Sequence, residues 1–236
     1  MAITAISKRD RLEPYLVRGV VVMAPRDASQ EELESRYRQA VAEIKAARFK
    51  RLFGQARIPR KFEVATWEMF DENDPAVKAA RKWAEGAGKP FLFLQGPVGT
   101  GKTTLGTVAF KERLQRELKP GLWREFMALI LELQAGFQTG QYERLLEGVA
   151  DAPILFLDDV GMAKATPWRQ EVLFVLVNRR YNDGLPTIFT TNLTLPAFAR
   201  TWGEPIMSRL HEAAELVHMA GKDLRRQMGG RRGGSR

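Results

Sequence analysis

The sequence predicts an α/β fold, a parallel β-sheet flanked by helices, and two observations support this prediction. Strand-like and helix-like segments alternate from about residue 90 onward, as they do in parallel sheets. One strand-like segment also leads directly into the pattern G-x-x-x-x-G-K-[ST], which forms a phosphate-binding loop between a strand and a helix. The chain has 236 residues, 44% of them hydrophobic, which is enough for one such domain and an N-terminal extension.

The N-terminal region predicts a helical extension. Residues 1–28 contain prolines and glycines that break helices, and within them 20–23 predicts either a short strand or a docking segment. Ser29 and Glu32 have the spacing of a capping box, and apolar residues then recur at helical spacing. We expect this helix to lead into a linker, residues 54–59, ahead of the sheet.

The region that forms the sheet alternates apolar runs with amphipathic segments, each bounded by proline, glycine or polar residues. The predicted strands are residues 91–94, 123–127, 153–157, 187–191 and 215–219, of which 123–127 is the least marked. The predicted helices are residues 103–118, 128–137, 141–149, 168–182, 196–202 and 205–214. This alternation predicts parallel strands with helices on both faces of the sheet.

The phosphate loop has a chemical reason for each of its residue types. Its glycines allow a tight turn whose N–H groups point inward as an anion nest. Lys102 is expected to reach the β- and γ-phosphates of a nucleotide, and Thr103 to offer its hydroxyl to Mg²⁺. The helix that follows presents its positive end to the phosphates. The residues expected to bind the nucleotide are Gly96, Pro97, Val98, Gly99, Thr100, Gly101, Lys102, Thr103 and Thr104.

Two further strand-like runs end in polar residues. Asp158 and Asp159 follow an apolar run, which places them at the carboxyl edge of the sheet beside the phosphate loop. Asp158 is expected to hold Mg²⁺, mostly through water, and Asp159 to orient or deprotonate the attacking water. Asn192 follows the strand-like run 187–191 and either hydrogen-bonds that water or caps a turn.

Arginines near the C-terminus are candidates for stabilising phosphoryl charge, from the same subunit or from a neighbour. Arg209 lies in a short amphipathic helix, and Arg225 and Arg226 follow. Taken singly, an arginine of this kind more often forms a surface ion pair.

The net charge of +9 is concentrated in two clusters, which predicts contact with a polyanion such as a nucleic acid. The alternative for either cluster is a solvated helix face or a mobile tail. The second cluster, residues 222–236, includes a glycine-rich end, 229–236, that predicts disorder. The first cluster comprises Lys45, Arg48, Lys50, Arg51, Arg57, Arg60 and Lys61, the first four of which we expect to contact DNA.

The composition also argues against disulfide-bonded, zinc-thiolate and membrane proteins. With no cysteine and two histidines, the chain has neither disulfides nor a thiolate zinc site. No apolar run approaches the roughly 20 residues of a membrane span, and the N-terminus lacks the pattern of a signal peptide. We therefore expect a soluble, cytoplasmic protein without a membrane partner.

The order of these parts resembles the AAA+ ATPase module, in particular the bacterial helicase loaders of the DnaC/DnaI type and the related IstB-type transposition ATPases. The order is phosphate loop, two aspartates, a Thr-Asn strand end, Ser208-Arg209 and a terminal arginine. The resemblance covers about residues 55–228. It is supported by residues 56–62, Ala65-Thr66-Trp67, Phe70, Asp158–Gly161 and Asn178–Tyr181.

The resemblance implies a role for each site residue. Gly96–Thr104 corresponds to Walker A, Asp158 with Asp159 to Walker B, and Asn192 to sensor 1. Arg209 corresponds to the arginine finger that a neighbouring subunit receives, and Arg225 or Arg226 to sensor 2. Many such proteins have Glu where this chain has Asp159, so the shorter side chain implies slow or partner-stimulated hydrolysis.

The same resemblance implies ATP and Mg²⁺ as cofactors and a homo-oligomer formed through the ATP site. The implied function is loading a hexameric replicative helicase onto single-stranded DNA. The region 128–150 corresponds to a DNA-contacting insertion, with Phe137, Tyr142 and Arg144 as candidate contacts. The implied division is a docking extension, 1–55, an ATPase core, 56–228, and a basic tail, 229–236. The extension is short and lacks the zinc-binding cysteines of some loaders.

Three other functions fit parts of the same pattern. An IstB-type ATPase would use this core to direct a transposase to double-stranded DNA. A P-loop kinase would transfer phosphate to a small molecule without responding to DNA. A nucleotide-gated adaptor would bind ATP with negligible turnover.

Overall fold

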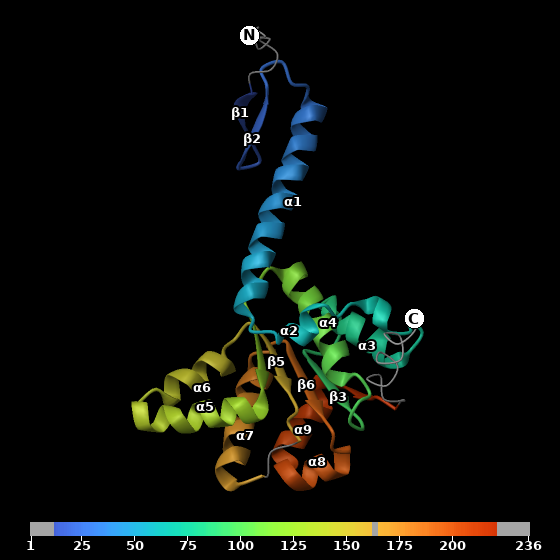
Figure 1. The fold of residues 1–236 in the computed structure, drawn as a ribbon, viewed down its shortest axis with the longest axis vertical. Helices are drawn as coiled ribbons and strands as arrows, with labels where there is room; N and C mark the ends of the chain where they lie inside the picture. The colour runs from blue at the N-terminus through green and yellow to red at the C-terminus, as the bar shows by residue number, and fades with distance from the viewer. Residues whose placement is uncertain (1–11, 162–164, 221–236) are drawn as a thin grey trace, which may run out of the picture. The chain divides into compact units, whose positions relative to one another are not determined.

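The computed structural model describes residues 12–161 and 165–220, and Figure 1 labels its elements. By its internal contacts the chain divides into two compact units, residues 1–51 and 52–236. Each unit is described by itself.

The first unit contains a β-hairpin and most of helix α1. Strands β1, Leu12–Val17, and β2, Val20–Pro25, pair antiparallel through a two-residue turn. Both turn residues, Arg18 and Gly19, have positive φ angles of 48° and 81°, as tight hairpins require. Helix α1 spans Gln30–Gln55, and the backbone N–H of Glu32 donates to Ser29 Oγ at 3.2 Å. The predicted N-terminal helix and its serine cap are confirmed, whereas β1 was not predicted.

The second unit contains a five-stranded parallel sheet in the order β4-β5-β6-β3-β7. This confirms the predicted α/β fold. Its strands are β3 Phe91–Gln95, β4 Gly121–Glu125, β5 Ile154–Asp158, β6 Thr187–Thr191 and β7 Ala214–His218. Its helices are α2 Arg60–Glu63, the 3-10 turn η2 Trp67–Met69, α3 Pro75–Ala84, α4 Lys102–Glu117, α5 Phe126–Thr139, α6 Tyr142–Ala150, α7 Pro167–Asn182, α8 Leu195–Trp202 and α9 Glu204–Ala213.

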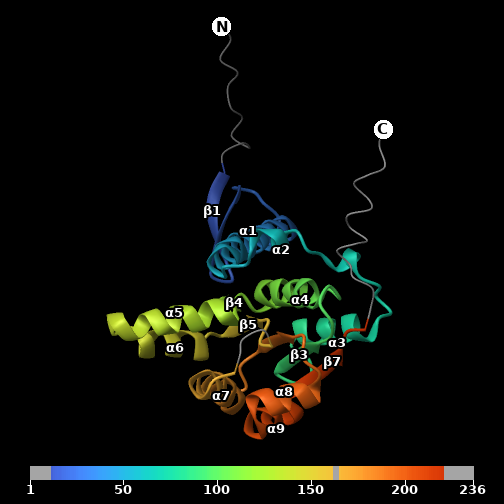
Figure 2. The same cartoon turned by 60° about the horizontal axis from the view of Figure 1, so that its bottom comes forward.

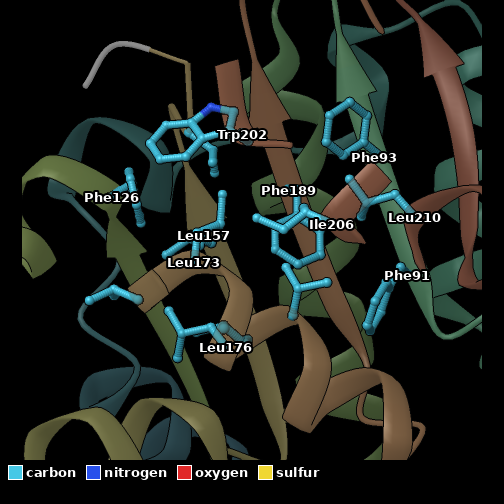
Figure 3. Packing of buried hydrophobic residues seen from close by; sticks show 14 of the residues in the cluster. Phe91, Phe93, Phe126, Leu157, Leu173, Leu176, Phe189, Trp202, Ile206 and Leu210 are labelled. Carbon is cyan, nitrogen blue, oxygen red and sulfur yellow. The ribbon is translucent and has the colours of Figure 1, made fainter. Parts of the chain in front are cut away.

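Helices cover both faces of this sheet, with α3 and α4 on one side and α7, α8 and α9 on the other (Figure 2). Because side chains alternate along a strand, each strand contributes to both interfaces. Phe93, labelled within the buried cluster of Figure 3, packs edge-on against Phe198 of α8, with the two ring centroids 5.0 Å apart. On the opposite face Phe156 lies 6.1 Å from Phe110 of α4. The three central strands β3, β5 and β6 are therefore almost wholly buried, as their continuous apolar runs predict, whereas the edge strands β4 and β7 are partly exposed.

Several features of the second unit differ from the sequence prediction. The predicted strand 123–127 begins and ends two residues earlier, as β4, and Phe126 and Met127 belong to α5. Helix α3 was not predicted, although Asp74 and Pro75 are a typical start signal: the Asp74 carboxylate accepts from the Ala76 N–H at 2.7 Å. Residues 54–59 are not a simple linker. Ala56 is buried and its carbonyl accepts from the Trp123 N–H at 2.8 Å, so this segment packs along the edge strand β4.

Arg180 of α7 is a charged side chain that is fully buried, with 0% exposure. Its guanidinium donates to the carbonyls of Ala150, Ala152 and Pro186 at 2.7–2.9 Å and to the Thr187 hydroxyl at 2.7 Å. Burial lowers the pKa of Arg180 to about 9, and the side chain remains charged at neutral pH. It thereby joins the end of α6 to the start of β6.

We expect Arg180→Met to lower the free energy of unfolding by about 3 kcal/mol, because buried carbonyls that lose a charged donor are costly. The matched control is Arg179→Met, since Arg179 is exposed and forms surface ion pairs with Asp151 and Asp183. That change should cost less than about 1 kcal/mol. Urea denaturation of both variants checks the difference, and equal losses would contradict the role assigned to Arg180.

Candidate nucleotide-binding site

The phosphate loop starts where β3 ends, between the ends of its two neighbouring strands. The Gly96 N–H donates to the carbonyl of Thr191 at 3.2 Å, and the Met219 N–H donates to the carbonyl of Gln95 at 2.7 Å. Gly96 has a φ of 151°, and a Cβ atom there would overlap the carbonyl oxygen of Met219. Glycine is therefore required at this position by both backbone angle and space.

The rest of the loop folds as an anion nest ahead of α4. Gly99 and Gly101 have φ angles of 90° and 88°, which turn successive N–H groups to one side. Because Gly101 is the N-cap and has no side chain, the first N–H groups of α4 receive no side-chain cap. Lys102 is only 6% exposed, and its Nζ donates to the carbonyls of Gly96 and Pro97 at 2.7 and 2.8 Å. The ammonium group thus lies against the first two residues of the loop.

Three side chains from three elements converge beside the loop. Thr103 of α4 donates its hydroxyl to Asp158 Oδ1 at 2.9 Å, and Thr190 of β6 donates to the same oxygen at 2.6 Å. The sequence predicted that Thr103 and Asp158 share a site, and the structure brings them into contact. Thr190 was not predicted. The alternation of side chains along β6 is a weak signal for a site residue, because it shows only on which face of the strand Thr190 lies.

The Asp158 carboxyl is buried, and its surroundings suit a cation. Burial raises the pKa of Asp158 to about 6; the carboxylates of Asp159 and Glu125 add to this, and the hydrogen bonds from Thr190 and Thr103 oppose it. A nearby cation favours the ionised carboxylate. A hydroxyl and a carboxylate oxygen next to a phosphate loop fit Mg²⁺, which takes one or two carboxylates together with phosphate oxygens and water.

Asp159 and Asn192 lie at the same edge of the sheet. Asp159 has a left-handed backbone with φ 59°, and its N–H donates to Thr190 Oγ1 at 2.9 Å. Aspartate tolerates this conformation better than most residues, and such angles cluster at functional sites. Asn192 is half-buried and directly follows β6, the strand between β5 and β3. Both residues are therefore at the edge that carries the phosphate loop.

Arg209 packs against α7 of its own protomer. Its Nε donates to Asn178 Oδ1 at 2.7 Å, its Nη1 donates to the Pro205 carbonyl at 2.8 Å, and its guanidinium lies over the ring of Phe174 at 4.9 Å. The side chain is half-buried in this position. The finger role stays a prediction. Arg225 and Arg226, the sensor 2 candidates, lie outside the described residues, as does the predicted tail, 229–236.

The structure also gives the surroundings of the residues that are predicted to contact DNA. The Phe137 ring stacks on that of Tyr142 at 4.1 Å, Trp168 lies beside both, and Phe137 remains 55% exposed. Arg144 is exposed on α6. In the first unit the predicted contacts Lys45, Arg48, Lys50 and Arg51 are exposed on α1, as is Arg38. Their contact with DNA stays a prediction.

The sheet order, the phosphate loop and the Thr103–Asp158 pair define the class: a P-loop nucleotide-binding protein with the AAA+ fold. The chain belongs to the family of IstB-like ATP binding proteins, which matches residues 28–230. A solved structure of the DnaC helicase loader shares the fold, with a TM-score of 0.62 and 24% identity over 69% of this chain and 100% of that one.

Two curated proteins show the range of the sequence relatives. The chain is 28% identical over 142 residues to the replicative helicase loader DnaI of Bacillus subtilis, covering 55% of this chain and 44% of DnaI. It is 28% identical over 182 residues to the insertion sequence IS21 putative ATP-binding protein of Pseudomonas aeruginosa, covering 72% and 67%. The chain thus spans less than half the length of DnaI.

Within residues 12–161 and 165–220, none of the helices combines the length and the apolar character that crossing a membrane requires.

Proposed function

We propose that this protein is an ATPase that loads a replicative helicase, binding ATP with Mg²⁺ and single-stranded DNA in the course of replication initiation. The observation that supports the ATPase part is the convergence of Thr103 and Thr190 on Asp158 beside the phosphate loop. Sequence similarity to a helicase loader, DnaI, supports the choice of partner.

Each site residue then has a defined task. The loop N–H groups and Lys102 bind the phosphates, and Thr103 with Asp158 would hold Mg²⁺. Bound there, Mg²⁺ would neutralise charge on the phosphate oxygens. Asp159 orients or deprotonates the attacking water, and Asn192 senses the γ-phosphate. We assign Arg209 to the ATP site of a neighbouring subunit, so that bound nucleotide controls assembly, and sensor 2 to Arg225 or Arg226.

The partner is tested by capture from an extract of the host cells. The immobilised full-length protein is incubated with extract in ATP or in ADP, and bound proteins are identified by mass spectrometry. A hexameric replicative helicase retained in ATP and released in ADP is the expected result. The Lys102→Ala variant is the control and should retain no helicase in either nucleotide. Recovery of a transposase in its place would contradict the loader function.

A second candidate, an IstB-type ATPase that directs a transposase to double-stranded DNA, is favoured by one observation. The family match covers residues 28–230, and the similarity to the IS21 protein extends over more of both chains than the similarity to DnaI. The two functions differ in their DNA preference. At matched salt, a loader is expected to bind single-stranded DNA more tightly than duplex DNA, and a transposition ATPase the reverse. Affinities for both DNAs have to be compared over the same salt series, because binding to the phosphate backbone depends on salt.

A further inference from the structure

A cavity of ≈400 Å³ lies in the second unit beside the edge strand β4. Its charged lining consists of Arg57, Arg124, Arg144 and Glu132, contributed by the segment after α1, by β4, by α6 and by α5. Apart from Gln141, the rest of the wall is apolar or small: Leu122, Leu129, Leu145, Gly148 and Val149. Three guanidinium groups against one carboxylate make the cavity cationic, and its size is that of a small-ligand site.

The positive charges in this cavity are incompletely paired. Glu132 lies 3.9 Å from Arg57 and 3.9 Å from Arg124, which exceeds hydrogen-bond distance. The Arg124 Nε–H is buried and has no hydrogen-bond partner within the part of the chain that the structure describes. This Nε is the atom that lies 3.9 Å from the Glu132 carboxylate, so the charge of Arg124 is only weakly compensated, and an anion bound in the cavity would add to that compensation. Burial and the charge of Arg57 also lower the pKa of Arg124.

The backbone at Arg57 is held in an unusual conformation. Its φ is 61°, the left-handed region that a non-glycine residue rarely occupies. The residues on either side, Ala56 and Ile58, are buried, so the chain is anchored around Arg57 while its side chain stays exposed. Helices commonly end in this conformation, but usually with glycine. Arginine at this position is strained, and its side chain lines the cavity.

We propose that this cavity binds one backbone phosphate of single-stranded DNA, held jointly by Arg57, Arg124 and Arg144, with the attached nucleotide against the apolar wall. The proposal rests on the proposed DNA binding and adds a defined phosphate site to it. Guanidinium forks match phosphate oxygens. A recess of this size admits a nucleotide that has left the base stack, which a single strand permits and an intact duplex does not.

The test measures binding of fluorescein-labelled oligothymidylate by anisotropy over a series of KCl concentrations, using the full chain. Arg57→Gly, Arg124→Gln and Arg144→Gln should each weaken binding about tenfold, the loss expected for a charge-assisted hydrogen bond. Arg57→Gly is the most informative variant, because glycine accepts the backbone angle and its unfolding midpoint should be unchanged or higher. Arg116→Gln removes the same charge from α4, outside the cavity, and should weaken binding little.

The salt dependence shows whether one phosphate is shared. In the triple variant Arg57→Gly/Arg124→Gln/Arg144→Gln, the slope of log affinity against log salt should change by about 0.7, the value for one lost phosphate on a single strand. A change of about 1.4 would mean two separate phosphates and would overturn the shared site.

Three other outcomes would also overturn the proposal. One is cavity variants that bind oligothymidylate as tightly as Arg116→Gln does. The second is that oligoglutamate displaces oligothymidylate from the wild type but not from Arg57→Gly. The third is that thymidine monophosphate alone does so, again from the wild type but not from Arg57→Gly. A wild type that binds no single-stranded DNA contradicts the proposed function itself, which separates the two failures.

Discussion

The Arg209→Ala variant is expected to hydrolyse ATP at least about 10³-fold more slowly than the wild type while binding ATP with nearly unchanged affinity, as loss of an arginine finger predicts. In its own protomer Arg209 contacts Asn178 and the ring of Phe174. If the guanidinium acts on the ATP of a neighbour, its loss affects the transition state and leaves the phosphate loop of the same protomer intact. Nucleotide affinity and steady-state hydrolysis, measured with single-stranded DNA present, check this.

A mixing experiment separates action on a neighbour from action within one subunit. Arg209→Ala keeps an intact Lys102, and Lys102→Ala keeps an intact Arg209. An equimolar mixture should regain hydrolysis, because some interfaces combine the intact loop of one variant with the intact arginine of the other. No regain, together with a collapse of ATP affinity in Arg209→Ala, would place the arginine in its own site. Unfolding midpoints measured alongside identify any loss caused by the missing contacts with α7.

The Lys102→Ala variant is expected to lose both ATP binding and hydrolysis, with hydrolysis falling by at least about 10²- to 10³-fold. The Lys102 ammonium lies across the phosphate loop, within 2.8 Å of two of its carbonyls. Removing it leaves the loop N–H groups but takes away the one side-chain charge that the loop itself contributes. Binding of a fluorescent ATP analogue and phosphate release measure the two losses.

Lys119→Ala is the matched control for this change. Lys119 is exposed, follows α4 and pairs with Glu117 at the surface, so its removal should leave both ATP binding and hydrolysis unchanged. A Lys102→Ala variant with wild-type ATP affinity would show that the nucleotide binds elsewhere.

Residues at the ends of strands were predictable from local patterns. An apolar run that ends in Asp158, and a second that ends before Gly96, must place both residues at the carboxyl edge once the sheet is parallel. Asp74 and Pro75 are an equally local start signal for helix α3, which the sequence prediction does not include. The functional roles of the site residues and of the predicted DNA contacts stay predictions.

Contacts across strands and between segments were not predictable. Thr190 meets Asp158 because β6 pairs directly with β5, and the pattern of a single strand does not specify its neighbour. Arg57 was assigned to a basic cluster within a linker, but tertiary packing of Ala56 against Trp123 brings it beside Arg124. No local sequence pattern therefore predicts the cationic cavity.

Sequence alone determined the parallel α/β core, the phosphate loop and the acidic strand end, because backbone geometry and side-chain alternation act over a few residues. Only the tertiary structure decided the strand order, the hydrogen bonds that meet at Asp158, and the grouping of three arginines beside β4. These depend on which distant segments pack together, and that is decided by burial over the whole chain.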